Sequence, residues 1–250
     1  MTTPVLDATS VATNSAVGNP TSLTITTGSA TSGIFALGII LLGQSAVVPS
    51  VTGVSTTGLS WAPRKAGGFL NGANLGNRNC DAELWEATTN AAFASATTTI
   101  SVTNTQTCAA VIFLFNGVTG ADANAAVPAF ATGAGASGSV AATVNVSTSG
   151  APDAIFGISG NCSDTTGATW VNGGSGFTDI VQVIAAGSQF CSIGAYYVIT
   201  NSPQNNSAVS SLANPGSTLG DNWFILADAL SGSGIPSMRR RVTPYYYTGT

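Results

Sequence analysis

Strand-like segments fill this chain, and they constrain its fold more than any other feature. Runs of Thr, Val and Ile are broken by Gly, Asn, Ser and Pro. Thr98, Ile100 and Val102 alternate with Thr99, Ser101 and Thr103, which is typical of a half-buried strand. The sequence shows no long apolar stripe of helical period with capping residues. It therefore predicts an all-β fold, an antiparallel β-sandwich of the jelly-roll type.

The runs predict where the strands lie. Four of them, 35–42, 111–115, 180–184 and 223–226, are apolar on both faces and are expected to be central strands. The full set of expected strands is 22–27, 35–42, 50–56, 82–89, 97–104, 109–116, 139–147, 153–159, 168–172, 177–185, 190–200 and 222–230. The expected core of two packed sheets includes Phe35, Ile39, Leu41, Val111, Phe113, Ile155, Val181, Ile184, Tyr197 and Phe224.

Two short matches, in the same order, indicate that the chain contains two related halves. TTGLSW ends at Trp61 and TTGATW ends at Trp170, each after an apolar strand. Later in each half a cysteine opens an aromatic strand, at Cys108 and at Cys191. Matched tryptophans in a duplicated sandwich are more often core anchors than ligand contacts. The two halves are expected to share one core.

The expected boundaries follow from composition. The halves span about 21–119 and 139–236, and the connection 120–138 is rich in small residues. Residues 1–20 and 237–250 are expected to be extended arms.

Charge is scarce, and this limits the partners. Charged residues make up 6% of the chain and its net charge is −4, whereas an average domain has roughly 25% charged residues. Lys65 is the only lysine, and Arg239–Arg241 is the only basic cluster, so no face suits nucleic acid. The apolar run Ile34–Leu42 is too short to span a membrane. A neutral surface favours packing in an assembly, and we expect a homo-oligomer.

The N-terminal segment 1–20 has neither a charged region nor an apolar core, so it does not resemble a secretory signal. We therefore expect synthesis in a host cytoplasm. Combined with an extracellular type of composition, this favours a virion component released by lysis. The alternative location is an extracellular surface.

Three segments carry a resemblance to a known group of modules. Leu84–Ala87 reads Leu-Trp-Glu-Ala, Thr98–Val102 alternates, and Leu114–Val118 ends a long apolar strand with Asn-Gly-Val. Over roughly residues 20–230 the chain resembles β-sandwich modules of phage structural and tail-appendage proteins and of some bacterial surface proteins. The last segment departs from the Glu-Tyr-Ser-Gly-Val pattern of those modules. The resemblance implies a structural role in a virion or on a surface and implies no reaction.

Conventional catalysis has no support in the sequence. The chain contains no histidine, which removes Ser-His and Cys-His pairs, histidine-ligated zinc and the usual general base near neutral pH. The glycine-rich segments lack the lysine of a phosphate loop. No D-x-D-x-D-G calcium loop is present. We expect a non-enzymatic protein without cofactor or metal.

The only carboxylate cluster is formed by Asp81, Glu83 and Glu86. On a strand, Asp81 and Glu83 point to the same face as Trp85, an arrangement that could form a sugar-stacking platform. The alternative is a solvated strand edge with one buried aromatic ring, and it carries more weight. A glycan therefore stays an open partner.

The cysteines are candidates for disulfides. Cys80 and Cys108 are 28 residues apart, and Cys162 and Cys191 are 29 apart, spacings too wide for a usual zinc site. If strands alternate in direction, each pair lies at one end of the sandwich. The pairing Cys80–Cys108 with Cys162–Cys191 is therefore preferred over the other connectivities. Four buried thiols that never meet are the alternative.

The C-terminal segment is a candidate assembly arm because Arg and Tyr are favoured at interfaces. It contains Arg239, Arg240, Arg241, Tyr245, Tyr246 and Tyr247.

Taken together, the sequence predicts a non-enzymatic virion protein that binds other virion proteins, such as a phage capsid decoration, fibre or tail component. A carbohydrate-binding or adhesin module is the alternative.

Overall fold

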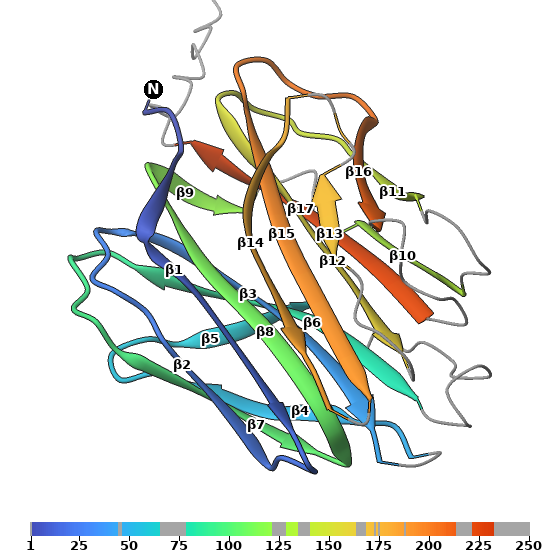
Figure 1. The fold of residues 1–250 in the computed structure, drawn as a ribbon. Coiled ribbons are helices and arrows are strands. Elements are labelled where there is room, and N and C mark those ends of the chain that lie inside the picture. The colour runs from blue at the N-terminus through green and yellow to red at the C-terminus, as the bar shows by residue number, and fades with distance from the viewer. Residues whose placement is uncertain are drawn as a thin grey trace, which may run out of the picture.

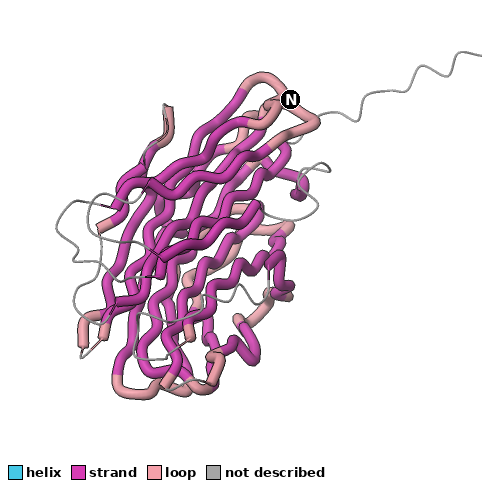
Figure 2. Tube along the Cα trace, turned by 90° about the vertical axis from the view of Figure 1, so that its right-hand side faces the viewer, coloured by secondary structure: helices cyan, strands magenta, loops and turns pink. Residues whose placement is uncertain are grey.

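A computed structural model describes most of the chain, and every regular element in the described part is a β-strand (Figures 1 and 2). The paired strands run antiparallel throughout. The predicted all-β antiparallel fold is thereby confirmed. The described residues are 2–44, 47–65, 79–121, 129–134, 141–163, 169–172, 174, 176–187, 189–213 and 222–232.

The first eight strands form two sheets. Inner sheet 1 has the order β1 (Val5–Val17), β8 (Thr105–Asn116), β3 (Gly33–Gly43), β6 (Cys80–Thr89) and β5 (Trp61–Lys65). Outer sheet 1 has the order β2 (Ser22–Thr26), β7 (Thr97–Thr103) and β4 (Ser50–Ser55). The opposed orders β1-β8-β3-β6 and β2-β7-β4 are those of a jelly roll.

The last eight strands repeat this arrangement. Inner sheet 2 has the order β10 (Ala129–Ala134), β17 (Asn222–Gly232), β12 (Asp153–Ser163), β15 (Phe190–Thr200) and β14 (Thr178–Ala185), and β9 (Val118–Ala121) also pairs with β17. Outer sheet 2 has the order β11 (Ala141–Val146), β16 (Ser207–Ala213) and β13 (Trp170–Asn172). Adding nine to each strand number of the first half gives the order of the second. The common origin of the halves stays a prediction.

The four sheets are stacked in layers, with the two inner sheets face to face in the middle (Figure 1). A central core joins the inner sheets, and each inner sheet also has a core against its own outer sheet. Strand β3 contributes to two of these cores. Ile34, Ile40 and Leu42 face the central core, whereas Phe35 and Leu37 face outer sheet 1. A strand buried on both faces must be apolar throughout.

Close approach of the inner sheets requires a glycine. A Cβ atom at Gly38 in β3 would lie 2.8 Å from a methyl carbon of Ile158 in β12. The missing side chain lets the isoleucine fill the space between the sheets.

The halves share a core, as expected, but the described strands form four sheets and not the expected two. Each half has enough strands to enclose a core of its own, and the shared core is a third one. The strands missing from the sequence prediction are β1, β5, β9, β10 and β16. Most of them are short or rich in small and hydroxyl residues, so they lack a strong apolar run.

The N-terminal segment is not a free arm. Val5–Val17 forms β1, which pairs with β8 along inner sheet 1 through a register shift between Asp7 and Ala12. Its position at the sheet edge explains the polar Thr, Ser and Asn side chains that suggested an arm. The expected connection 120–138 contains β10 and part of β9; residues 122–128 and 135–138 lie outside the described part.

The expected core was mostly right. Two of the ten expected residues, Val181 and Tyr197, are partly buried against the central core, and Ile184 is 39% exposed. The other seven are buried: Phe35, Ile39, Leu41, Val111, Phe113, Ile155 and Phe224. The strand that carries Ile184, β14, is an edge strand of inner sheet 2 and not a central one. Although its sequence is largely apolar, exposed and partly buried residues alternate along the second half of β14.

The short sequence matches did not identify equivalent positions. Trp61 begins β5, whereas Trp170 begins β13, which corresponds to β4. Cys108 lies in β8 and Cys191 in β15, the counterpart of β6. Both tryptophans nevertheless pack in cores between an inner and an outer sheet, and their indole N–H groups donate to Thr56 and Ser192.

Candidate functional site

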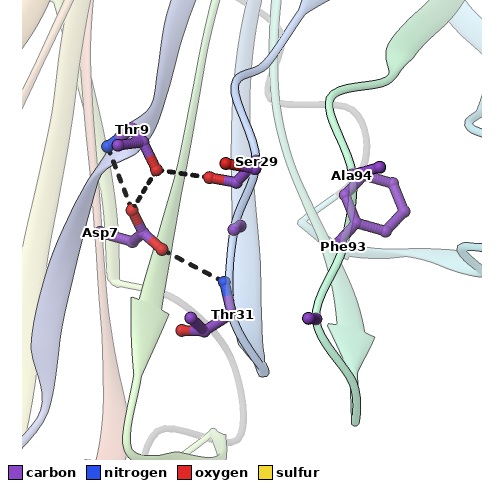
Figure 3. A pocket seen from close by; sticks show the side chains of 8 residues that line it. Asp7, Thr9, Ser29, Thr31, Phe93 and Ala94 are labelled. Carbon is purple, nitrogen blue, oxygen red and sulfur yellow. Dashed lines mark hydrogen bonds between the residues drawn. The ribbon is translucent and has the colours of Figure 1, made fainter.

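A hollow of about 650 Å³ opens at one end of the first jelly roll (Figure 3). It lies where β1 meets the connection from β2 to β3 and the connection from β6 to β7. In Figure 3 the backbone of Ser29 and Thr31 lies between the Asp7 side chain and the Phe93 ring. The lining residues are Asp7, Thr9, Ser29, Ala30, Thr31, Ala92, Phe93 and Ala94.

Backbone hydrogen bonds fix the walls of this hollow. Gly28 N donates to Thr9 O at 3.1 Å, and any Cβ at residue 28 would collide with that carbonyl. Ala30 and Phe93 exchange two backbone hydrogen bonds, at 2.8 and 2.7 Å. The Phe93 ring packs edge-on against the ring of Phe35 in the core, with 5.6 Å between the ring centroids. The aromatic wall is therefore anchored and needs little ordering to receive a ligand.

Asp7 organises the polar side of the hollow. Its carboxylate accepts hydrogen bonds from Thr9 N (3.1 Å), Thr9 Oγ1 (2.6 Å), Thr31 N (3.3 Å) and Asn116 Nδ2 (3.4 Å). Partial burial acts to raise the pKa of Asp7, but these hydrogen bonds outweigh it and lower the pKa below its ordinary 3.8. The carboxylate therefore stays ionised at neutral pH and cannot serve there as a general acid.

The carboxylates of the candidate sugar platform lie inside the sandwich. Asp81 is completely buried and Glu83 is 4% exposed. Glu83 accepts hydrogen bonds from Trp85 Nε1 at 2.7 Å and from Val51 N at 3.2 Å, and so connects β6 to β4 of outer sheet 1. Trp85 packs against the core of the first half. These residues support the fold, and neither the platform nor the solvated edge that was its alternative is present.

Glu86, the third acid of that cluster, belongs to a different group. Arg64 of β5 binds Asp228 of β17 through Nε at 2.9 Å and Nη2 at 2.8 Å, and its Nε lies 3.6 Å from Glu86 Oε2. The Asp228 side chain is completely buried, whereas those of Arg64 and Glu86 are 19% and 14% exposed. This cluster, the Arg64 clamp, joins the two inner sheets.

A register shift in β5 between Pro63 and Lys65 accompanies the clamp. Such bulges re-aim a side chain, and here Arg64 reaches the facing sheet. Burial and the charge of Asp228 raise the pKa of Glu86 from 4.5 to about 7, against the lowering effect of Arg64. Neither Arg64 nor Asp228 was predicted as a site residue. The available signal was an aspartate inside the apolar strand Trp223–Leu230, which demands a buried partner.

The cysteines are buried thiols, and only one predicted pair is brought together. Cys162 and Cys191 are opposed in the β12–β15 ladder with their sulfurs 3.5 Å apart. Cys80 and Cys108 do lie at the same end of inner sheet 1, opposite Leu42 and Leu41. However, β3 runs between them and they face different cores, so the predicted Cys80–Cys108 bridge is sterically excluded.

The remaining predicted site lies outside the described residues: Arg239–Arg241 and Tyr245–Tyr247. Within the described part, no three His, Cys, Asp or Glu side chains form a group that could hold a metal ion. The same part contains no helix long and apolar enough to cross a membrane. The chain matches no known family model, no curated protein and no solved structure.

Proposed function

We propose that the protein is a non-enzymatic structural component of a virion that acts by assembling with other virion proteins. The observation that carries this proposal is the stacking of two jelly rolls of equal strand order through their inner sheets. Jelly rolls are a common architecture of viral capsid proteins and of lectins.

The distribution of charge supports the same proposal. Carboxylates that would normally repel neighbouring subunits are buried; they are Asp81, Glu83, Asp153 and Asp228. With a net charge of −4 in 250 residues, little electrostatic repulsion opposes self-association. Exposed valines at Val5, Val17 and Val47 add apolar contact area.

The proposal predicts that the protein assembles in solution. We expect light scattering coupled to size-exclusion chromatography to give a mass that is a multiple of 24.7 kDa. A variant ending at residue 238 should form smaller or weaker assemblies while its far-ultraviolet dichroism remains unchanged, because it lacks the Arg- and Tyr-rich segment. A monomer at all concentrations would contradict self-assembly, and absence of the protein from purified particles would contradict the virion role.

The hollow at Asp7 and Phe93 favours a second candidate, a carbohydrate-binding module. It combines hydroxyl groups, an ionised carboxylate and an anchored aromatic ring, which suit a neutral sugar. Under this candidate, Phe93→Ala should abolish binding on a glycan array. Phe177→Ala, which removes a partly buried ring from the other jelly roll, is the matched control and should bind as the wild type does. Equal binding by all three proteins, or none by the wild type, would reject this candidate.

A further inference from the structure

Cys162 and Cys191 occupy directly opposed positions on neighbouring strands of inner sheet 2. Their sulfur atoms are 3.5 Å apart, and both side chains are completely buried in the central core. Each thiol also reaches the facing sheet, Cys162 at Leu41 O (3.8 Å) and Cys191 at Thr107 O (3.4 Å). The two thiols are therefore held in contact by both inner sheets.

We propose that Cys162 and Cys191 form a cross-strand disulfide when the protein meets a disulfide oxidant such as glutathione disulfide, and that this is the one intrachain bridge of the described fold. The inference does not depend on the proposed function. It assigns a modification site to one strand pair, β12 and β15, and excludes the pairing of the other two cysteines with each other.

The backbone already suits this bond. Opposed residues of an antiparallel pair have Cα atoms about 4.5–5.5 Å apart, which lies within the range of about 4.4–6.8 Å found across disulfides. An S–S bond needs a separation of about 2.05 Å. The sulfurs must therefore approach by about 1.5 Å, which rotation about the Cα–Cβ bonds can provide without a change of register.

The same reasoning excludes Cys80 with Cys108. These residues lie on strands β6 and β8, and β3 separates them in the sheet. Two strand spacings amount to about 9.5 Å, beyond the roughly 7 Å that a disulfide tolerates. They also face opposite sides of the sheet, Cys80 toward the central core and Cys108 toward outer sheet 1.

The reaction balances by thiol–disulfide exchange. One cysteine thiolate attacks glutathione disulfide and releases one glutathione thiolate, which leaves a mixed disulfide on the protein. The second cysteine then displaces the remaining glutathione. Overall, two protein S–H bonds are replaced by one S–S bond, and one glutathione disulfide is reduced to two glutathione thiols that carry the two protons.

Access to the pair runs through the edge strand β14. Cys191 is flanked on one side by Cys162 and on the other by Ala185, near the end of β14. Local opening of β14, away from both β15 and the facing strands β1 and β8, would expose Cys191. Burial and the neighbouring Cys162 raise the pKa of Cys191 well above 9.0, so little thiolate forms in the closed protein. We expect slow oxidation whose rate rises with pH and with low concentrations of urea.

The test uses the full-length protein incubated with glutathione disulfide, followed by alkylation of remaining thiols and peptide mapping without reduction. We expect one Cys162–Cys191 linkage, with Cys80 and Cys108 recovered as alkylated thiols. The oxidised protein should melt roughly 5–10 °C higher than the reduced protein, because the bridge constrains the unfolded chain.

Two variants supply the controls. Cys191→Ser should lose both the linkage and the difference in melting temperature. The double variant Cys80→Ser/Cys108→Ser should keep both. The mapping of the wild type needs no variant to fold, so it decides the matter by itself. Four alkylated thiols after oxidation in low urea, or any linkage that includes Cys80 or Cys108, would overturn the proposal.

Discussion

Replacing Arg64 by methionine is expected to lower the free energy of unfolding by about 3–5 kcal/mol at pH 8. The substitution keeps an unbranched side chain but removes the cation between Asp228 and Glu86. Asp228 is completely buried, so its charge would lose the guanidinium that binds it through two nitrogens. A buried carboxylate without a cation is strongly disfavoured. Denaturation by urea, followed by tryptophan fluorescence, measures the loss.

Two further variants separate charge from packing. Arg64→Lys keeps the charge but loses the bidentate fork, so we expect an intermediate loss. The triple variant Arg64→Met/Glu86→Gln/Asp228→Asn removes the whole cluster and should regain most of the stability. In the wild type, Asp228 Oδ1 accepts a hydrogen bond from Ala229 N at 2.9 Å. In the triple variant, the side-chain amide oxygen at position 228 can still accept this hydrogen bond. A loss below about 1 kcal/mol for Arg64→Met, or no recovery in the triple variant, would contradict a clamp between the inner sheets.

The strands that could be predicted from the sequence are those with a strong pattern. The continuous apolar runs of β3, β8 and β17 are central strands, because only a strand between two cores is apolar on both faces. The alternation of β7 matches its burial pattern. By contrast, β14 has an apolar run at a sheet edge, where neighbours and not composition decide exposure.

The layering and the clamp could not be predicted, because both depend on contacts between distant parts of the chain. Arg64 and Asp228 are 164 residues apart and meet only when the inner sheets stack. The prediction that Cys80 and Cys108 lie at the same end of the sandwich was right. The order of strands in the sheet, which places β3 between their strands, could not be predicted from the sequence. The hollow is likewise lined by Asp7 and Thr9 from the irregular part of β1, a segment whose sequence suggested an arm.

The Arg64 clamp also makes stability depend on pH. Glu86 has a pKa of about 7 in the folded protein against an ordinary 4.5, because burial and Asp228 disfavour its charge. Its Oε1 is buried without a hydrogen-bond partner among the described residues. A raised carboxyl pKa means that the folded state binds more protons than the unfolded state between about pH 4.5 and 7. Stability therefore falls as pH rises through this window, by up to about 3 kcal/mol.

Glu86→Gln is expected to remove this dependence. Glutamine is neutral at every pH, so the variant should match the wild type near pH 4 and exceed its free energy of unfolding by up to about 3 kcal/mol at pH 8. Urea denaturation of both proteins from pH 4 to 8 gives the difference, in which the titration of groups distant from the Arg64 clamp cancels. Asp179→Asn, which removes one exposed carboxyl group of β14, controls for the change in net charge. Parallel curves for the wild type and Glu86→Gln, or a less stable variant at pH 8, would show that the carboxyl group of Glu86 is already ionised without penalty beside Arg64.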